Sequence, residues 1–196
     1  MRTTVRRLAT ATLIAGSVAA SPTHAQREVP MGSDSYAHLG AGVIFPEEVD
    51  AFRRGRVIEY DAQGNNVSVG YKPSDQRGEM TVFVYPGSEQ TCRFWFEDAD
   101  RAVMTREGAA RSSEATPMRL LPVNVPDQHS ARYKLAPGSY GFDHPELVSY
   151  LWVGCVAGGK WVVKYRGSFE AANEDKAKGL AEQLFAAIDW TALTDR

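Results

Sequence analysis

The sequence has few of the residues and motifs that identify an enzyme or a metalloprotein. It contains four His and two Cys among 196 residues, with no His-x-x-x-His pair and no Cys-x-x-Cys pair. It also lacks the Gly-x-Ser-x-Gly pattern of a hydrolase nucleophile elbow. These absences exclude the usual zinc-site and serine-hydrolase signatures.

One segment matches the pattern of a phosphate-binding loop but lacks its chemistry. Residues 154–160 satisfy Gly-x-x-x-x-Gly-Lys. A phosphate loop needs Ser or Thr after the Lys to hold magnesium, and a helix must begin there. Trp161 follows instead, at the start of a strand-like segment. The pattern therefore predicts a turn between two strands.

An excess of basic charge is also missing. Removing residues 1–25 takes three Arg and no acid from 22 basic and 24 acidic residues, which leaves 19 and 24 and a formal charge of −5. Nucleic-acid binding needs clustered Lys and Arg to neutralise phosphates. We expect no nucleic-acid partner.

The N-terminal residues have the pattern of an export signal. Arg2, Arg6 and Arg7 precede an uncharged apolar run over residues 8–20, which is shorter than the roughly 20 residues needed to cross a bilayer. Small residues predict cleavage after Ala25, with a site after Ala20 as the alternative. A buried helix of the fold is the competing interpretation of this run.

These features predict the organisation of the chain. Residues 1–25 are expected to be a cleavable signal peptide, residues 26–42 a flexible tail and residues 43–196 a single α+β domain. No Cys lies near the end of the apolar run and no later stretch reaches membrane-spanning length. We therefore expect an exported protein, periplasmic or secreted, without a membrane anchor.

The two cysteines, Cys92 and Cys155, both lie in the predicted mature chain. In an oxidising compartment such a pair is a disulfide candidate. Closing this loop would stabilise the fold by about 4 kcal/mol through the entropy of the unfolded chain. Two buried free thiols are the alternative.

Apolar periodicity predicts a mainly antiparallel sheet with two main helices. One hairpin is expected over residues 56–72 and a central strand over 79–85, apolar on both faces. A helix is expected from Cys92, with its apolar stripe reaching Val103, Gly108 as the C-terminal stop signal, and Glu97 and Arg101 paired on its outer side. A second hairpin turns at Gly158 and Gly159, and a closing helix capped by Asn173 runs to about Ile188.

The closing block resembles a known domain family. The segment 159–166, Gly-Lys-Trp-Val-Val-Lys-Tyr-Arg, followed by an acidic-capped helix ending in Ile188, Asp189 and Trp190, looks like the C-terminal hairpin and helix of PsbP-like domains. The early block with Phe45-Pro46 and residues 82–86 is similar to uncharacterised exported bacterial proteins. The resemblance implies an α/β/α sandwich that serves as a binding or accessory module and carries no shared catalytic set.

Two groups of residues are candidates for a functional site. Lys160, Lys164 and Arg166 project together at period two and could bind an anionic ligand or partner, unless they form a solvated face. The irregular segment 109–145 is predicted to carry functional loops, among them a polar loop with Ser139, Asp143 and His144.

A metal site has only weak support. It could use His129 with Asp127, or Asp143, His144 and Glu146, but both spacings are unspecific. We therefore expect no metal and no cofactor.

Function is left as a choice among three hypotheses. The first is a non-enzymatic exported binding or accessory protein of the cell envelope, with an unknown protein or small ligand as partner. The second is a small secreted hydrolase, in which His144 or His129 lies in a cleft beside Ser139 or an acid. The third is a carrier of a small apolar ligand in a cavity lined by Trp152 and Trp161.

Overall fold

A computed structural model describes residues 26–30, 32, 34–74, 78–112, 120–121, 125–138 and 144–194. The predicted signal peptide, residues 1–25, lies outside these ranges. Within them, no helix is both long enough and apolar enough to cross a membrane.

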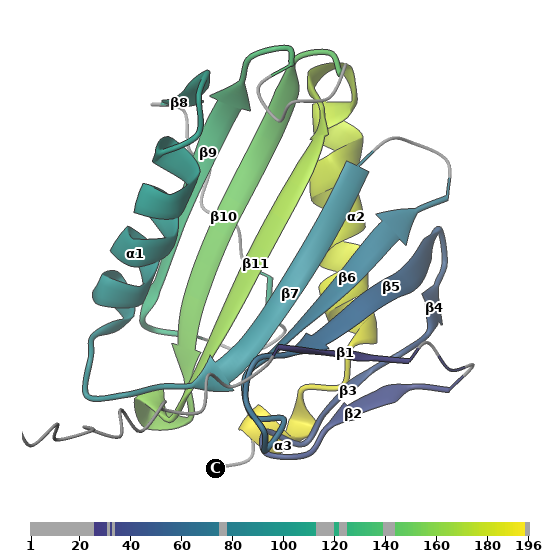
Figure 1. Ribbon diagram of the computed structural model, residues 1–196, viewed down its shortest axis with the longest axis vertical. Coiled ribbons are helices and arrows are strands. Elements are labelled where there is room, and N and C mark those ends of the chain that lie inside the picture. Colours follow the sequence, from purple (N-terminus) through teal and green to yellow (C-terminus); the bar gives the residue numbers. More distant parts are fainter. Residues whose placement is uncertain are drawn as a thin grey trace, which may run out of the picture.

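The described chain forms one large antiparallel sheet with the order β1-β5-β6-β7-β11-β10-β9-β8, in which β4 also pairs with β5 (Figure 1). A separate pair, β2 and β3, lies below it in Figure 1. The strands are β1 (Arg27–Val29), β2 (Tyr36–His38), β3 (Val43–Phe45), β4 (Glu48–Val49), β5 (Phe52–Glu59), β6 (Val67–Pro73), β7 (Gly78–Pro86), β8 (Ala109–Arg111), β9 (Gln128–Leu135), β10 (Leu147–Val156) and β11 (Trp161–Glu170).

The two main helices are α1 (Cys92–Met104) and α2 (Glu174–Ala187), and a short α3 (Thr191–Thr194) follows. Helix α1 packs on β8, β9 and β10 at one end of the sheet, while α2 crosses the opposite face (Figure 1). Because α1 covers only that end, the α1 face of the sheet continues past it over β11, β7 and β6. The fold is α+β, as the sequence predicts.

Strand alternation sends side chains to two hydrophobic clusters. On β11, Trp161, Val163, Tyr165 and Phe169 join the larger cluster between the sheet and α2. Val162, on the opposite face, joins the smaller cluster beneath α1. The face of α2 that packs on this cluster includes the buried residues Leu180, Leu184 and Phe185. Lys164 and Arg166 therefore belong to the α1 face of the sheet.

The predicted hairpins and central strand are confirmed. Strands β5 and β6 pair, β7 lies between β6 and β11, and β10 pairs with β11 along ten residue pairs. Between β10 and β11 the chain makes a short 3-10 turn, Ala157–Gly159, in which Gly158 and Gly159 have positive φ. The segment with the phosphate-loop pattern is thus a strand, a turn and a strand.

Residues 26–42 differ from the prediction of a flexible tail. β1 pairs with β5, and β2 pairs with β3. His38 is fully buried, where its Nδ1 accepts a hydrogen bond of 3.0 Å from the Ala41 amide. Its Nε2 lies 3.0 Å from the Asn65 carbonyl oxygen, to which it can donate. Three-residue strands are too short to show a period, which is why the pattern misses them.

Two local predictions are corrected. Glu97 pairs with Arg93 at 2.8 Å, not with Arg101, which lies 3.6 Å from Asp98. Asn173 precedes α2 but makes no capping hydrogen bond through its side chain.

Candidate functional site

A groove runs over the uncovered half of the α1 face, with a cavity volume of about 630 Å³. Volumes of this size hold small-molecule ligands in other proteins. Strands β7 and β11 supply its floor, β6 and the segment before β10 supply its walls, and Arg106 borders it just after α1. Its lining residues are Lys72, Pro73, Gly78, Glu79, Thr81, Phe83, Arg106, His144, Pro145, Leu147, Arg166, Ser168 and Glu170.

Small residues produce the hollow. Thr81 lies on β7 between Gly70 of β6 and Arg166 of β11, its neighbours in the sheet. A residue without a side chain at position 70 leaves the floor low beside Thr81. Ser168, one pair further along, is small as well. Small residues on an open sheet face therefore contribute to the groove.

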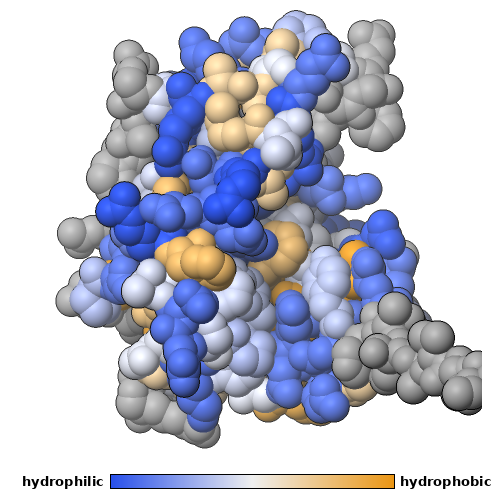
Figure 2. Space-filling model, turned by 60° about the vertical axis from the view of Figure 1, so that its left-hand side comes forward, coloured by the Kyte–Doolittle hydropathy of each residue, from blue (hydrophilic) through white to orange (hydrophobic). Residues whose placement is uncertain are grey.

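The lining combines charge with apolar surface. Three cationic side chains, Lys72, Arg106 and Arg166, outnumber the carboxylates Glu79 and Glu170. Apolar surface comes from two Pro, Leu147 and Phe83. In Figure 2, the coloured part of the side bearing α1 shows hydrophilic residues gathered in patches, with apolar residues in smaller areas between them. This arrangement suits a ligand with one anionic end and an apolar body.

Lys164 does not line the groove itself, but its side chain lies against Phe83, which does. Its Nζ lies 4.0 Å from the centroid of the Phe83 ring and 5.6 Å from that of Tyr85. No carboxylate oxygen of the described residues lies within salt-bridge distance. Burial, and after it the neighbouring Arg166 charge, lowers the pKa of Lys164 to about 8, against a smaller opposing effect of Asp98.

The structure separates the three predicted cationic residues. Lys164 and Arg166 share the α1 face of β11, and Arg166 lines the groove. Lys160 is exposed at the turn before β11, about 13 Å from Lys164 at the usual rise of a strand. Of the three predicted cationic residues, Lys164 and Arg166 therefore share one face of β11.

Of the predicted polar loop, only His144 is described, because Ser139 and Asp143 lie outside the described ranges. His144 lines the groove together with Ser168 and Glu170. Its Nδ1 lies 2.6 Å from the Pro145 carbonyl oxygen, to which it can donate. The Ser168 hydroxyl donates to Ser149 Oγ at 2.9 Å, and Ser149 donates to the Gly167 carbonyl. The Ser168 hydroxyl therefore directs its proton to Ser149 and not to His144.

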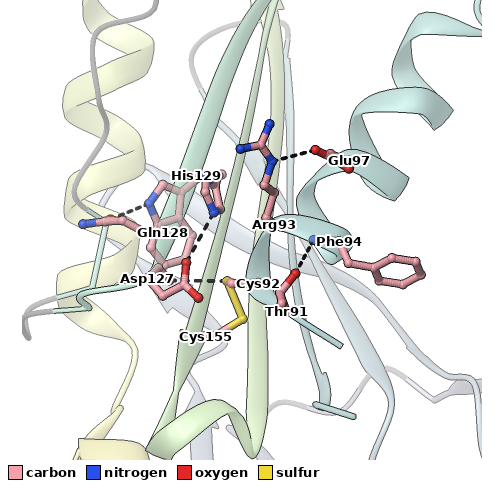
Figure 3. Close-up of polar contacts among 10 residues, drawn as sticks. Thr91, Cys92, Arg93, Phe94, Glu97, Asp127, Gln128, His129 and Cys155 are labelled. Carbon is pink, nitrogen blue, oxygen red and sulfur yellow. Dashed lines mark hydrogen bonds and ion pairs between the residues drawn. A yellow bond between two sulfur atoms is a disulfide. The ribbon is translucent and has the colours of Figure 1, made fainter. Parts of the chain in front are cut away.

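The disulfide prediction is confirmed, since Cys92 and Cys155 are bonded with their Cα atoms 5.7 Å apart (Figure 3). The bond ties the first residue of α1 to β10. The carbonyl oxygen of Asp127 lies 3.3 Å from Cys92 Sγ. The Cys92–Cys155 disulfide is therefore a structural clamp that holds α1 over one end of the sheet. The other end of the α1 face stays uncovered.

His129 and Asp127 lie close to this clamp (Figure 3). His129 Nε2 is 3.3 Å from Asp127 Oδ1, and the His129 ring packs 5.5 Å from the Phe96 ring. Among the described residues, no group of three or more His, Cys, Asp or Glu side chains is placed to hold a metal ion. These contacts position β9 against α1.

A second polar cluster ties α2 to the sheet on the opposite face. Arg132 of β9 donates from Nε to Glu174 Oε1 at 2.6 Å and from its Nη2 to Glu174 Oε2 at 2.5 Å. The Tyr150 hydroxyl of β10 donates to Glu174 Oε1 as well. The Arg132 guanidinium, with the Tyr150 hydroxyl, holds the pKa of the Glu174 carboxyl at about 2.

The two tryptophans proposed to line an apolar cavity lie in the core. Trp152 packs 6.1 Å from Phe185 of α2, and its Nε1 donates to Gln128 Oε1 at 2.9 Å. Trp161 packs edge-on to His38 at 5.3 Å. Both side chains therefore fill the space where a carrier would keep a cavity.

Sequence reasoning missed most of the groove. Lys72, Thr81 and Phe83 were assigned to strands without a functional role. The alternation of β7 shows that Thr81 and Phe83 share a face, and this was the available signal. The part of the sheet that α1 leaves uncovered depends on how the helix packs. Periodicity in the sequence therefore does not identify the groove.

Comparison with known proteins finds little. No family model and no curated protein matches this chain. Among solved structures, it is similar to the crystal structure of LpqN, a protein involved in cell envelope biogenesis of Mycobacterium tuberculosis. The TM-score is 0.43 with 10% sequence identity, over 83% of this chain and 90% of that chain.

Proposed function

We propose that this chain is an exported, non-enzymatic binding protein that holds a small anionic ligand in the groove on the α1 face of its sheet. The observation that carries the proposal is the groove itself, about 630 Å³ in volume and lined by more cationic than acidic side chains. Its apolar residues favour a ligand that is only partly polar.

Two features support action outside the cytoplasm. The Cys92–Cys155 disulfide is typical of proteins in oxidising compartments. The basic and apolar N-terminal segment has the pattern of a signal peptide. We infer a periplasmic or secreted protein of the cell envelope, and a PsbP-like sandwich acting as an accessory module would fit this role.

The test is to fill the groove. Thr81 lies beside Gly70, so Thr81→Trp would place an indole across the floor without entering the core. Native mass spectrometry of the mature protein, recovered from its own envelope, should show a bound small molecule on the wild type and none on Thr81→Trp. Lys134→Trp is the matched control, because Lys134 is exposed on β9 and lies on the opposite face of the sheet.

The control should keep the ligand. Wild-type protein without any bound mass, or Thr81→Trp carrying the same mass, would refute the groove as the binding site.

A hydrolase is the second candidate, and one observation favours it. His144 lies in the same groove as Glu170 and Ser168. If the groove is catalytic, wild-type protein should cleave p-nitrophenyl esters and His144→Ala should lose the activity. Ester cleavage that His144→Ala removes would replace the non-enzymatic proposal.

A further inference from the structure

A second cleft lies at the end of the sheet where the Cys92–Cys155 disulfide ties α1 to β10 (Figure 3). Its cavity volume is about 580 Å³, a size that admits small molecules. The segment before α1, the segment before β9 and the turn between β10 and β11 form its walls. Both cysteines line this cleft, together with polar residues that include Gln90 and Asp127.

The two cysteines differ in exposure. Cys92 is only 2% exposed, whereas Cys155 is partly exposed. Thiol–disulfide exchange requires a thiolate to reach one of the two sulfur atoms, and access helps to decide which one is attacked. The sulfur atom of Cys155 is therefore the one that a thiol in the cleft can reach.

Attack at Cys155 would release Cys92, and the position of Cys92 favours that departure. Cys92 is the first residue of α1, whose first turn contains Arg93 and no acidic residue. The helix dipole is positive at this end, which lowers the pKa of a thiol and makes it a better leaving group. Thr91 caps the helix by accepting a hydrogen bond of 3.2 Å from the Phe94 amide, which keeps the first turn in place around the sulfur.

Contacts other than the disulfide also hold α1 on the sheet. Phe96 is buried in the cluster beneath the helix, and the Tyr133 hydroxyl donates to Asp100 Oδ1 at 2.6 Å. The Asp127 carbonyl oxygen lies 3.3 Å from Cys92 Sγ and can accept a hydrogen bond from the released thiol. The two sulfur atoms would therefore stay close after exchange, so the bond can form again.

We propose that Cys155 is a thiolation site, at which a low-molecular-weight thiol enters the cleft and exchanges with the disulfide. The thiolate of the small molecule attacks Cys155 Sγ and forms a new S–S bond there. The bond to Cys92 breaks, and Cys92 leaves with the electron pair as a thiolate that takes up a proton. The incoming sulfur is oxidised to the disulfide level and Cys92 is reduced to a thiol, so the step needs no further oxidant or reductant. This site is separate from the groove and does not rest on the proposed function.

The rate of exchange in the folded protein tests the proposal. The oxidised protein is treated with dithiothreitol, whose second thiol completes the reduction, at several urea concentrations below the unfolding transition. Direct attack through the cleft should give a second-order rate constant that urea does not change. If exchange required unfolding, the rate would rise steeply with urea as the unfolded population does. Such a rise would overturn the proposal.

A variant that fills the cleft tests the entry path. Gln90→Trp places an indole at an exposed position that lines the cleft, and it should slow reduction by dithiothreitol by about tenfold without changing the urea midpoint. Glu182→Trp, at an exposed position of α2, is the matched control and should react as the wild type does. Equal rates in all three proteins would overturn the cleft as the path to the disulfide.

Single-cysteine variants test which sulfur atom is reached. With oxidised glutathione, the Cys155 thiol of Cys92→Ser should form the mixed disulfide about ten times faster than the Cys92 thiol of Cys155→Ser, as followed by intact-protein mass spectrometry. Equal rates, or faster reaction at Cys92, would overturn the assignment of Cys155.

Discussion

Replacing Glu174 with Gln should destabilise the protein in a way that depends on pH. Glu174 is the first residue of α2 and accepts three hydrogen bonds, two from Arg132 and one from Tyr150. The side chains of Arg132 and Glu174 are only 12% and 22% exposed. The variant would leave a largely buried guanidinium without its carboxylate.

The magnitude follows from the pKa of the Glu174 carboxyl. Its ordinary value of 4.5 applies to the unfolded chain, and the hydrogen bonds from Arg132 lower it to about 2 in the fold. Complete coupling would correspond to at most about 3 kcal/mol. Because part of the side chain meets solvent, we expect about 2 kcal/mol.

The sign follows from the lowered pKa of Glu174 in the folded state. A carboxyl with a depressed pKa contributes stability that is fully present above about pH 4.5 and is lost as the pH falls through about 2. Urea unfolding should therefore show wild type more stable than Glu174→Gln by about 2 kcal/mol at pH 7. Near pH 2 the difference should be mostly lost.

Two results would refute this reasoning. A difference that stays constant from pH 7 to pH 2 would show that the cost comes from packing and not from the charge. Equal stability at pH 7 would show that the cluster does not anchor α2. Tyr150→Phe removes one of the three hydrogen bonds and should cost about 1 kcal/mol at pH 7.

Two further predictions concern the backbone and the disulfide. Replacing both Cys92 and Cys155 by Ala should lower the free energy of unfolding by about 4 kcal/mol in urea, and a reductant should destabilise only the wild type; unchanged stability of the variant would contradict the clamp. Gly87→Ala should cost about 2 kcal/mol, because the new Cβ would lie 1.8 Å from the Gly159 carbonyl oxygen. Gly32→Ala meets nothing within 4 Å and should be neutral in the same assay.

Sequence patterns predicted the parts of the fold where apolar residues repeat over many positions. The ten-residue strand β11 alternates clearly, and it forms one arm of the hairpin predicted to turn at Gly158 and Gly159. The apolar residues on both faces of β7 indicated a central strand, which the structure confirms. Long elements carry enough residues for a period to stand out from chance.

The missed parts depend on contacts that no local pattern records. His38 is buried through its hydrogen bonds to Ala41 and to a loop 27 residues away, and a polar residue in a short strand gives no apolar signal. Glu97 was expected to pair with Arg101, four residues later. Arg93, four residues earlier, is equally within reach on a helix, and it is the residue that pairs with Glu97.

The candidate site was predicted only in part. Period two placed Lys164 and Arg166 on one face, as the structure finds. The alternation could not show that Lys164 would lie on the Phe83 ring, because cross-strand neighbours depend on register. It also could not show that α1 leaves this half of the sheet open.

The side-chain amine of Lys164 is the most direct reporter of the groove. Its titration by heteronuclear NMR should give a pKa near 8 in the free protein and a higher value with dodecyl phosphate bound, since a bound anion favours the charged amine. A pKa that dodecyl phosphate does not change would contradict an anion-binding groove at this end of the sheet.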